Sequence, residues 1–415
     1  MKPRARSATT ESRQTDTVDI LEAFGPLAAM HAALERQGIG LPCSAVGFFP
    51  ARRAEALHLA VARVAARLPV LTSGMAWQGD RALLRLAAGG PAPLSAPMDF
   101  RADETGVWGY RLTEDGDGVW LVGAWAHAAA DGPSMLRFLA AVACELNGER
   151  RQWDGDKPRP PSRRQAMAAW LPGFVLEHAR RYKGLNPENR LARPGACFAI
   201  LPPDAAERLD RDSRRSGVAG RLAAATAACL LEQQRGRADG EVYLNVPIAR
   251  GGAAALAGFG FEGSSLRLPL RLSRGQGFEA AAVDAGERLR RRIEQGWDLN
   301  LLKFLSGPAS RRMKFASIQA SKPPDPCLTI SWKGRREGIG AAQGLIRVAC
   351  FAAAPTLHLS AHVSDEGLSL SLSTPQARGA RRELLLQILE RLGLGQPAEV
   401  RELADLTEGP LSRAD

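Results

Sequence analysis

Apolar residues change their spacing repeatedly along this chain, and the order of the changes limits which folds it can adopt. Over residues 52–68 they recur every three to four positions, which predicts an amphipathic helix. Residues 71–77 and 82–86 alternate instead, on either side of Gln78-Gly79-Asp80, which predicts a β-hairpin. Since hairpins stand beside helices rather than in strict strand–helix–strand order, we expect an α+β fold and not a doubly wound sheet.

The same mixture of elements covers the rest of the chain. Strands are predicted over 45–49, 108–112, 119–127, 196–201, 241–248, 265–272, 328–332, 345–351, 357–363 and 368–373. Helices are predicted over 133–146, 203–215, 222–234, 278–295 and 380–392, and a helix or a helix and a turn over 19–37. A length of 415 residues exceeds one ordinary core. We therefore divide the chain into a disordered lead-in (1–17), an N-terminal lobe (18–185) and a C-terminal lobe (186–415).

The composition indicates which partners and which cellular compartment suit the protein, but it does not indicate a reaction. The net charge of +11 suits an anionic partner, or it is simply a solvated surface. Six cysteines without C-x-x-C spacing argue against a disulfide framework and a zinc site, and they favour a reducing cytoplasm. The chain has neither an apolar run long enough to span a bilayer nor a secretory signal at its start.

Three local patterns are set aside. Residues 258–263 match G-x-G-x-x-G, but a dinucleotide site needs a helix after the glycines and here a strand follows. His358 and His362 lie on a predicted strand, where they would share an exposed or cavity-lining face; no third metal ligand is evident, so no metal is expected. The basic runs 288–292 and 311–314 lack interleaved aromatics, so we expect solvated helix faces and no nucleic-acid binding.

His127 belongs to the sequence His-Ala-Ala-Ala-Asp-Gly, which ends at Gly132. The histidine closes a predicted apolar strand, and Asp131 or Gly132 is placed to cap the helix that follows. A histidine at the end of a strand, followed by an aspartate that only caps a helix, would give the same sequence without a catalytic role. Side chains between a strand and a helix are nevertheless often functional, and an imidazole titrates near neutral pH. We therefore predict His127 as a general base.

With its surroundings this segment resembles the chloramphenicol acetyltransferase-like superfamily, which includes condensation domains, the plant BAHD enzymes and polyketide-associated acyltransferases. His127, Asp131 and Gly132 match its H-x-x-x-D-G signature, again between a strand and a helix. Weaker likenesses follow in the family's order, at the 52–71 helix and Pro-containing stretch, at 216–218, at Asn245 to Arg250, and at Ile330-Ser331-Trp332-Lys333-Gly334.

The resemblance implies two lobes, each a mixed sheet with flanking helices, forming a V-shaped pseudo-dimer around a central tunnel. His127 would be the catalytic base, Asp131 a structural residue paired with Arg250, and Gly132 a tight turn that leaves room for the acyl donor. Ser331, with Trp332, would supply an oxyanion contact or line the tunnel. The donor would be acyl-CoA or an acyl carrier protein and the acceptor a small amine or alcohol, with no resident cofactor and a monomeric chain.

Two departures bear on the subfamily. Condensation domains usually carry a second histidine before the catalytic one, where this chain has Ala126. The D-F-G-W-G motif of the plant enzymes is absent. We therefore prefer a stand-alone acyltransferase of secondary or lipid metabolism. The alternatives are a condensation-type enzyme that forms amide bonds on carrier-bound substrates, and a catalytically silent module that recruits a carrier.

Overall fold

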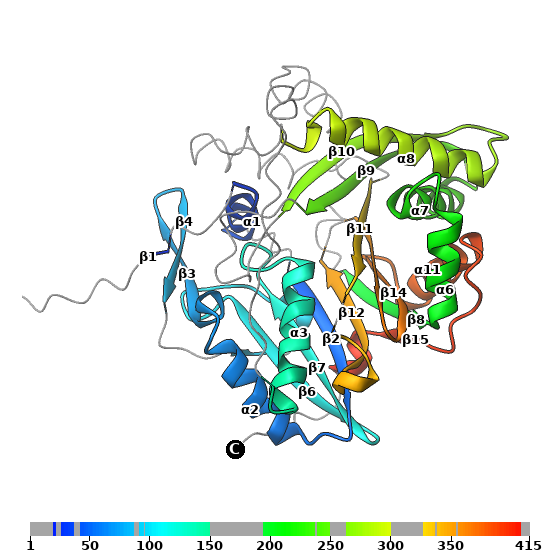
Figure 1. Cartoon of the computed structure of the whole chain (residues 1–415). Helices are drawn as coiled ribbons and strands as arrows, with labels where there is room; N and C mark the ends of the chain where they lie inside the picture. Colours follow the sequence, from blue (N-terminus) through cyan, green and yellow to red (C-terminus); the bar gives the residue numbers. More distant parts are fainter. Residues whose placement is uncertain are drawn as a thin grey trace, which may run out of the picture.

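The computed structural model describes residues 20–21, 26–36, 42–86, 91–94, 96–149, 194–236, 239–249, 263–299, 327–336, 338–353 and 356–407. The predicted lead-in and the boundary at 185/186 lie outside these ranges. Figure 1 shows two lobes, the first coloured mainly blue and cyan and the second mainly green to red. This confirms the predicted α+β, two-lobed architecture.

The N-terminal lobe is built on a mixed five-stranded sheet in the order β12-β2-β7-β6-β5. Its strands are β2 (Cys43–Pro50), β5 (Ala92–Pro93), β6 (Trp108–Asp115), β7 (Gly118–Trp125) and β12 (Ile346–Ala352). Helices α2 (Ala54–Ala65) and α3 (Gly132–Leu146) pack against each other, and α3 lies on β2 and β12. Because β2 and β7 are buried along almost their whole length, they form the centre of this lobe.

A small antiparallel sheet, β1-β4-β3, stands at the edge of the lobe. It consists of β1 (Ile20–Leu21), β3 (Ser73–Gln78) and β4 (Arg81–Leu86), so the predicted hairpin is confirmed. The segment 19–37, predicted as a helix or a helix and a turn, begins instead with a short strand. Residues 20–21 form β1 and pair with β4, and helix α1 (Pro26–Arg36) follows.

The C-terminal lobe has a seven-stranded mixed sheet in the order β10-β9-β11-β13-β14-β8-β15. Its strands are β8 (Gly195–Leu201), β9 (Gly240–Ala249), β10 (Gly263–Leu272), β11 (Cys327–Arg335), β13 (Leu357–Ser364), β14 (Gly367–Thr374) and β15 (Val400–Glu402). Its helices are α6 (Pro203–Asp212), α7 (Val218–Arg235), α8 (Phe278–Glu294) and α11 (Arg378–Arg391). Short 3₁₀ helices lie at Pro69–Thr72, Pro97–Asp99, Ala341–Gln343 and Ala404–Leu406.

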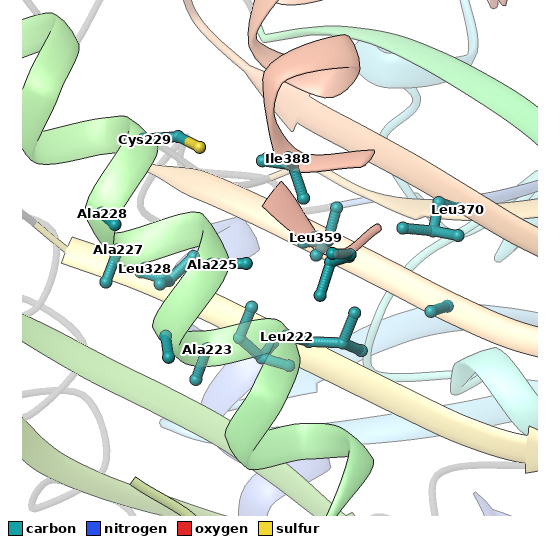
Figure 2. Close-up of a cluster of buried hydrophobic side chains, with 14 of the residues drawn as sticks. Leu222, Ala223, Ala225, Ala227, Ala228, Cys229, Leu328, Leu359, Leu370 and Ile388 are labelled. Carbon is teal, nitrogen blue, oxygen red and sulfur yellow. The ribbon is translucent and has the colours of Figure 1, made fainter. Parts of the chain in front are cut away.

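Small side chains let α7 lie close to this sheet. Figure 2 shows its alanines beside Leu328, Leu359 and Leu370 on three neighbouring strands. On another side α7 meets α8, where a Cβ at Gly220 would overlap the backbone of Gly286. The helices therefore cover one face of the sheet and leave its other face toward the N-terminal lobe.

Strand β12 crosses between the lobes. It follows β11 in the chain but pairs with β2, from Ala352 opposite Cys43 to Ile346 opposite Phe48. The predicted division at 185/186 assigns residues 346–352 to the C-terminal lobe, whereas hydrogen bonding places them in the N-terminal sheet. The lobes are thus joined by a shared strand as well as by contact.

An apolar cluster lies between the two sheets. Phe198 of β8 packs edge-on against Trp120 of β7 and Phe351 of β12, with ring centroids 6.0 and 5.8 Å apart. Polar contacts close the rim of this cluster, including the 2.8 Å ion pair between Arg401 and Asp115. The relative position of the lobes is consequently fixed on this side.

Two surface predictions can be compared with the structure. Arg288, Arg290 and Arg291 are exposed on α8, as expected of a solvated helix face. The run 311–314 lies outside the described ranges. Within those ranges, no helix is long and apolar enough to cross a membrane.

Candidate active site

His127 follows β7 directly, in a turn that leads into α3. The turn is closed by hydrogen bonds from the amides of Ala129 and Ala130 to the carbonyl of Ala126, at 2.8 and 3.3 Å. The imidazole Nδ1 lies 3.2 Å from the carbonyl oxygen of Ala130. A carbonyl oxygen can only accept, so Nδ1 carries the proton and Nε2 carries the lone pair. A base needs this tautomer.

Asp131 caps α3, which confirms the first of the two predicted caps. Its Oδ1 accepts a 2.9 Å hydrogen bond from the amide of Ser134, and its own carbonyl accepts from Met135 at 3.1 Å. The cap fixes where the helix begins and therefore the length of the turn that carries His127. The predicted partner of Asp131, Arg250, lies outside the described residues.

Burial sets the charge of His127. Desolvation lowers the pKa of His127 below its usual 6.5, although the carbonyl of Ala130 and the carboxylate of Asp131 oppose this shift. The ring is therefore neutral at neutral pH, as a base must be before it accepts a proton.

A second histidine, which the sequence analysis did not single out, lies against the first. His31 on α1 places its ring 4.2 Å from that of His127, centroid to centroid, at a tilt of 43°. Burial, followed by the charges of His127 and Arg267, lowers the pKa of His31 well below 6.5. Two neighbouring neutral imidazoles thus occupy this side of the site.

Lys333 covers the opposite side of the turn. A Cβ at Gly132 would overlap Cε of Lys333, so the glycine is what allows the lysine to lie there. The Lys333 ammonium donates a hydrogen bond to the hydroxyl of Ser360 on β13. Burial lowers the pKa of Lys333. Gly132 was expected to leave room for an acyl donor, and in the structure part of that room holds a lysine side chain.

Alternation along β11 separates the other two predicted residues. Ser331 pairs in register with Ser360, on the face that also carries Lys333. Trp332 is on the other face, where it packs against the helix-covered core of the C-terminal lobe. The expectation that Trp332 lines a tunnel is therefore corrected, because neighbouring strand residues point to opposite faces of a sheet.

A polar network extends the face of Ser331 toward β10. The amide nitrogen of Asn245 donates to the hydroxyl of Thr329 at 3.3 Å. Its oxygen accepts from Ser265 and, at 3.3 Å, from Nε of Arg267. The C-terminal sheet thus presents hydrogen-bonding groups toward the other lobe.

His358 and His362 lie on β13, as predicted, but they are buried rather than exposed, with 8% and 1% of their surface accessible. Burial, followed by the charge of Lys333, lowers the pKa of both to about 3. His358 hydrogen-bonds to the backbone of Ala352 on β12, while Nε2 of each ring lacks a partner. No cluster of three metal-binding side chains occurs in the part of the chain that the structure describes.

Two cysteines lie beside the site. The thiol of Cys350 lies 3.9 Å from the carbonyl oxygen of Gly132. Burial raises the pKa of Cys350 to about 11 and that of Cys43 well above its usual value. Both thiols are protonated at neutral pH, so neither is suited to act as a nucleophile.

Comparison with known proteins gives a match only at the level of structure. No model of a protein family matches the sequence, and no curated protein matches it. A condensation domain of the calcium-dependent antibiotic synthetase, solved with a substrate analogue, is 15% identical, with a TM-score of 0.62, and covers 96% of this chain and 100% of its own.

Two other solved structures support the same fold. The trichothecene 15-O-acetyltransferase TRI3 from Fusarium sporotrichioides is 12% identical, with a TM-score of 0.61, over 90% of this chain and 95% of its own. An epimerization domain of tyrocidine synthetase B is 13% identical, with a TM-score of 0.58, over 92% and 98%. The chain therefore has the fold of condensation domains and chloramphenicol acetyltransferase-like acyltransferases, as the resemblance predicted.

Proposed function

We propose that this chain is an acyltransferase that moves an acyl group from a thioester to an amine or hydroxyl, with His127 as general base. The observation that carries the proposal is the arrangement of His127. A half-buried, neutral imidazole is held through Nδ1 on the turn between β7 and α3, and in this tautomer Nε2 is the basic nitrogen. The acyltransferases and condensation domains that share the fold make this chemistry the first to test.

The reaction needs one proton to move twice. The acceptor N–H or O–H gives its proton to Nε2 of His127 while the new C–N or C–O bond forms at the thioester carbonyl. The tetrahedral intermediate then collapses, the C–S bond breaks, and the imidazolium returns the proton to the departing thiolate. No covalent enzyme intermediate is required.

Charge that develops on the thioester oxygen needs a donor. Ser331 is our candidate, since it lies on the face of β11 that also carries Lys333. Asp131 acts structurally, through its cap and through the pairing with Arg250 that we also propose. The co-substrate is CoA or the phosphopantetheine of a carrier protein, and no resident cofactor takes part. We place this chemistry in the cytoplasm, in a monomeric chain.

Condensation is the second candidate, since condensation domains share the fold over nearly the whole chain. Ala126 replaces the histidine that usually precedes the base in that group. Intact-mass analysis of mixtures that contain acyl-CoA or acyl-loaded carrier protein separates the two readings. An acylated small acceptor supports the first reading, whereas a carrier-bound amide product supports condensation.

The test of the base is His127→Ala in the full chain. We expect the rate of acyl transfer to fall by about 10²- to 10⁴-fold, the usual contribution of a positioned base. His58→Ala is the matched control, because His58 contacts Tyr110 rather than the turn that carries His127. Retention of full activity by a folded His127→Ala variant would show that the base lies elsewhere, and inactivity of the wild type with every thioester would favour the silent recruiting module.

A further inference from the structure

Four of the six histidines of the chain and one of its seven lysines meet where the lobes face each other. The rings of His31 and His127 contact each other at a tilt of 43°. The charge of Lys333 acts on both His358 and His362, and that of His127 acts on His358. The proposed mechanism uses only His127, so the role of the remaining basic groups is open.

Among the described residues, no carboxylate pairs with the half-buried ammonium group of Lys333, as one normally does with a cation removed from solvent. Its only hydrogen-bond partner among the described residues is the uncharged hydroxyl of Ser360. No carboxylate in the described ranges forms an ion pair with it, and Asp131, whose charge also acts on Lys333, uses Oδ1 to cap α3. The side chain also lies beside Gly132, at the positive end of the α3 dipole. Each of these features favours an anion next to the ammonium group.

The neighbouring histidines point to a ligand as well. His358, Ser360 and His362 alternate along β13, so their side chains share the face that meets Lys333. His358 gives its one N–H to the backbone of Ala352, which leaves Nε2 as a buried acceptor without a donor. A ligand that pairs with the ammonium of Lys333 and also donates to Nε2 of His358 carries both an acid group and an N–H or O–H.

The choice of lysine is informative in this chain, which has far more arginines than lysines. An ammonium is a compact point charge, whereas a guanidinium is a wide planar fork. Lys333 lies close over Gly132, where its Cε occupies the space that a Cβ would take, so its compact ammonium lies beside the start of α3. A single carboxylate, rather than a phosphate held by several arginines, matches this geometry.

We propose that Lys333 binds the carboxylate of the acyl acceptor, so that the acceptor is an amino acid or a hydroxy acid. The amino or hydroxyl group of the same molecule gives its reacting proton to the base His127, and where the acceptor is an amine its second N–H donates to the buried acceptor Nε2 of His358. This inference rests on the proposed acyl transfer for the reaction, but not for the binding. An anion at Lys333 is a property of the site that can be measured without turnover.

The binding test uses calorimetric titration of the full chain with L-amino acids and L-lactate, each paired with its carboxamide. For at least one pair we expect the acid to bind about 10- to 100-fold more tightly than the amide, the usual range for a buried charge-assisted hydrogen bond. Lys333→Met should remove this difference. Arg335→Met is the matched control, because it removes one exposed positive charge from the same strand and should keep the preference.

His127→Ala separates this proposal from the proposed function. The variant should lose acyl transfer but keep the preference for the acid, since the base does not hold the carboxylate. Lys333→Gln gives a second uncharged side chain if Lys333→Met proves unstable by thermal unfolding. Equal binding of acid and amide in every pair, or no binding at all, would overturn the proposal.

Turnover provides the last comparison. With a fixed thioester, Lys333→Met should raise KM for the acid acceptor and leave the amide acceptor unchanged. An equal fall in kcat for both would mean that Lys333 serves charge that develops in the reaction, and would overturn carboxylate binding. Succinyl and butyryl thioesters of N-acetylcysteamine test the donor in the same way. If the effect of Lys333→Met followed the succinyl carboxylate instead, the assignment to the acceptor would be wrong.

Discussion

The two ring nitrogens of His127 have different surroundings, and its proposed role as a base depends on this difference. Nδ1 is held by the carbonyl of Ala130, which fixes the tautomer, and burial keeps the ring neutral. A histidine at the end of a strand is common, but one with both features is prepared to accept a proton. The H-x-x-x-D-G sequence alone shows neither the fixed tautomer nor the neutral state of the ring.

The pH dependence of acyl transfer follows from this burial. Since the neutral form is the active one and desolvation lowers the pKa of His127 below 6.5, we expect the acid limb of the kcat/KM profile to have its midpoint below pH 6.5. The profile is measured with a thioester and an acceptor that do not titrate in this range. An acid limb with its midpoint at or above 6.5 would contradict the buried site.

Lys333 and His31 show what a search for motifs overlooks. Lys333 occupies the variable position of the Ile330-to-Gly334 segment, and His31 lies about a hundred residues before the signature. Alternation along 327–335 places Lys333 on the face of Ser331, and this could have been predicted. The contact of His31 with His127 could not, because it depends on how α1 packs.

Helix α3 connects the chemistry of the turn to the stability of the lobe. Asp131 caps its first turn, and the buried face of α3 packs on β2 and β12. A change at the cap therefore alters the start of the helix and the turn that carries His127.

Two substitutions at Asp131 distinguish the stability that comes from its helix cap from the stability that comes from its negative charge. We expect Asp131→Ala to lower the free energy of unfolding by about 0.5–2 kcal/mol, the usual value of a lost side-chain cap. Asp131→Asn keeps an acceptor for the amide of Ser134 but removes the charge, so we expect a loss of stability from the proposed pairing with Arg250 even where the cap is retained. Chemical denaturation of both variants gives the comparison. If Asp131→Asn is as unstable as Asp131→Ala, the charge of Asp131, and hence its proposed pairing with Arg250, matters more than the cap.

Strand β12 supplies part of the hydrogen bonding between the two lobes. The carbonyl of Cys350 accepts from Ser371, and the backbone of Ala352 bonds to His358. Since β12 also pairs with β2, it belongs to the N-terminal sheet while it contacts the C-terminal one. The buried histidines of β13 thus lie at the junction of the two lobes.

Acid should destabilise the whole molecule through these histidines. The pKa of His358 and His362 is about 3 in the folded chain and about 6.5 when unfolded, so between these values the unfolded state binds more protons. The free energy of unfolding should therefore fall as the pH decreases from about 6.5 to about 3. Each histidine contributes a slope of up to about 1.4 kcal/mol per pH unit.

The variant His358→Asn/His362→Asn checks this contribution. Denaturation between pH 4 and 6 should show a shallower dependence of the free energy of unfolding on pH than in the wild type. His58→Asn, a histidine with no place between the lobes, serves as the control and should leave the slope almost unchanged. An unaltered slope in the double variant would show that these histidines are protonated in the folded state.

The comparison with solved structures identifies the fold of the whole molecule, but the fold does not identify one reaction. An acetyltransferase, condensation domains and an epimerization domain all share it. A fold supports many reactions, and the site selects among them. For this chain we propose that His127 and the acceptor bound at Lys333 decide the reaction.

The sequence by itself determined the local elements and the candidate base. Periods of two and 3.6 residues report which face of a segment is buried, so most of the longer described strands and helices lie where their patterns predicted. The short strands β1, β5 and β15 were not predicted. His127 and the cap Asp131 followed from neighbours in the chain. The sequence could not determine that β12 joins the first sheet, that His31 contacts His127, or that Lys333 covers Gly132. Those contacts join residues far apart in the chain, and only the packing of the two lobes brings them together.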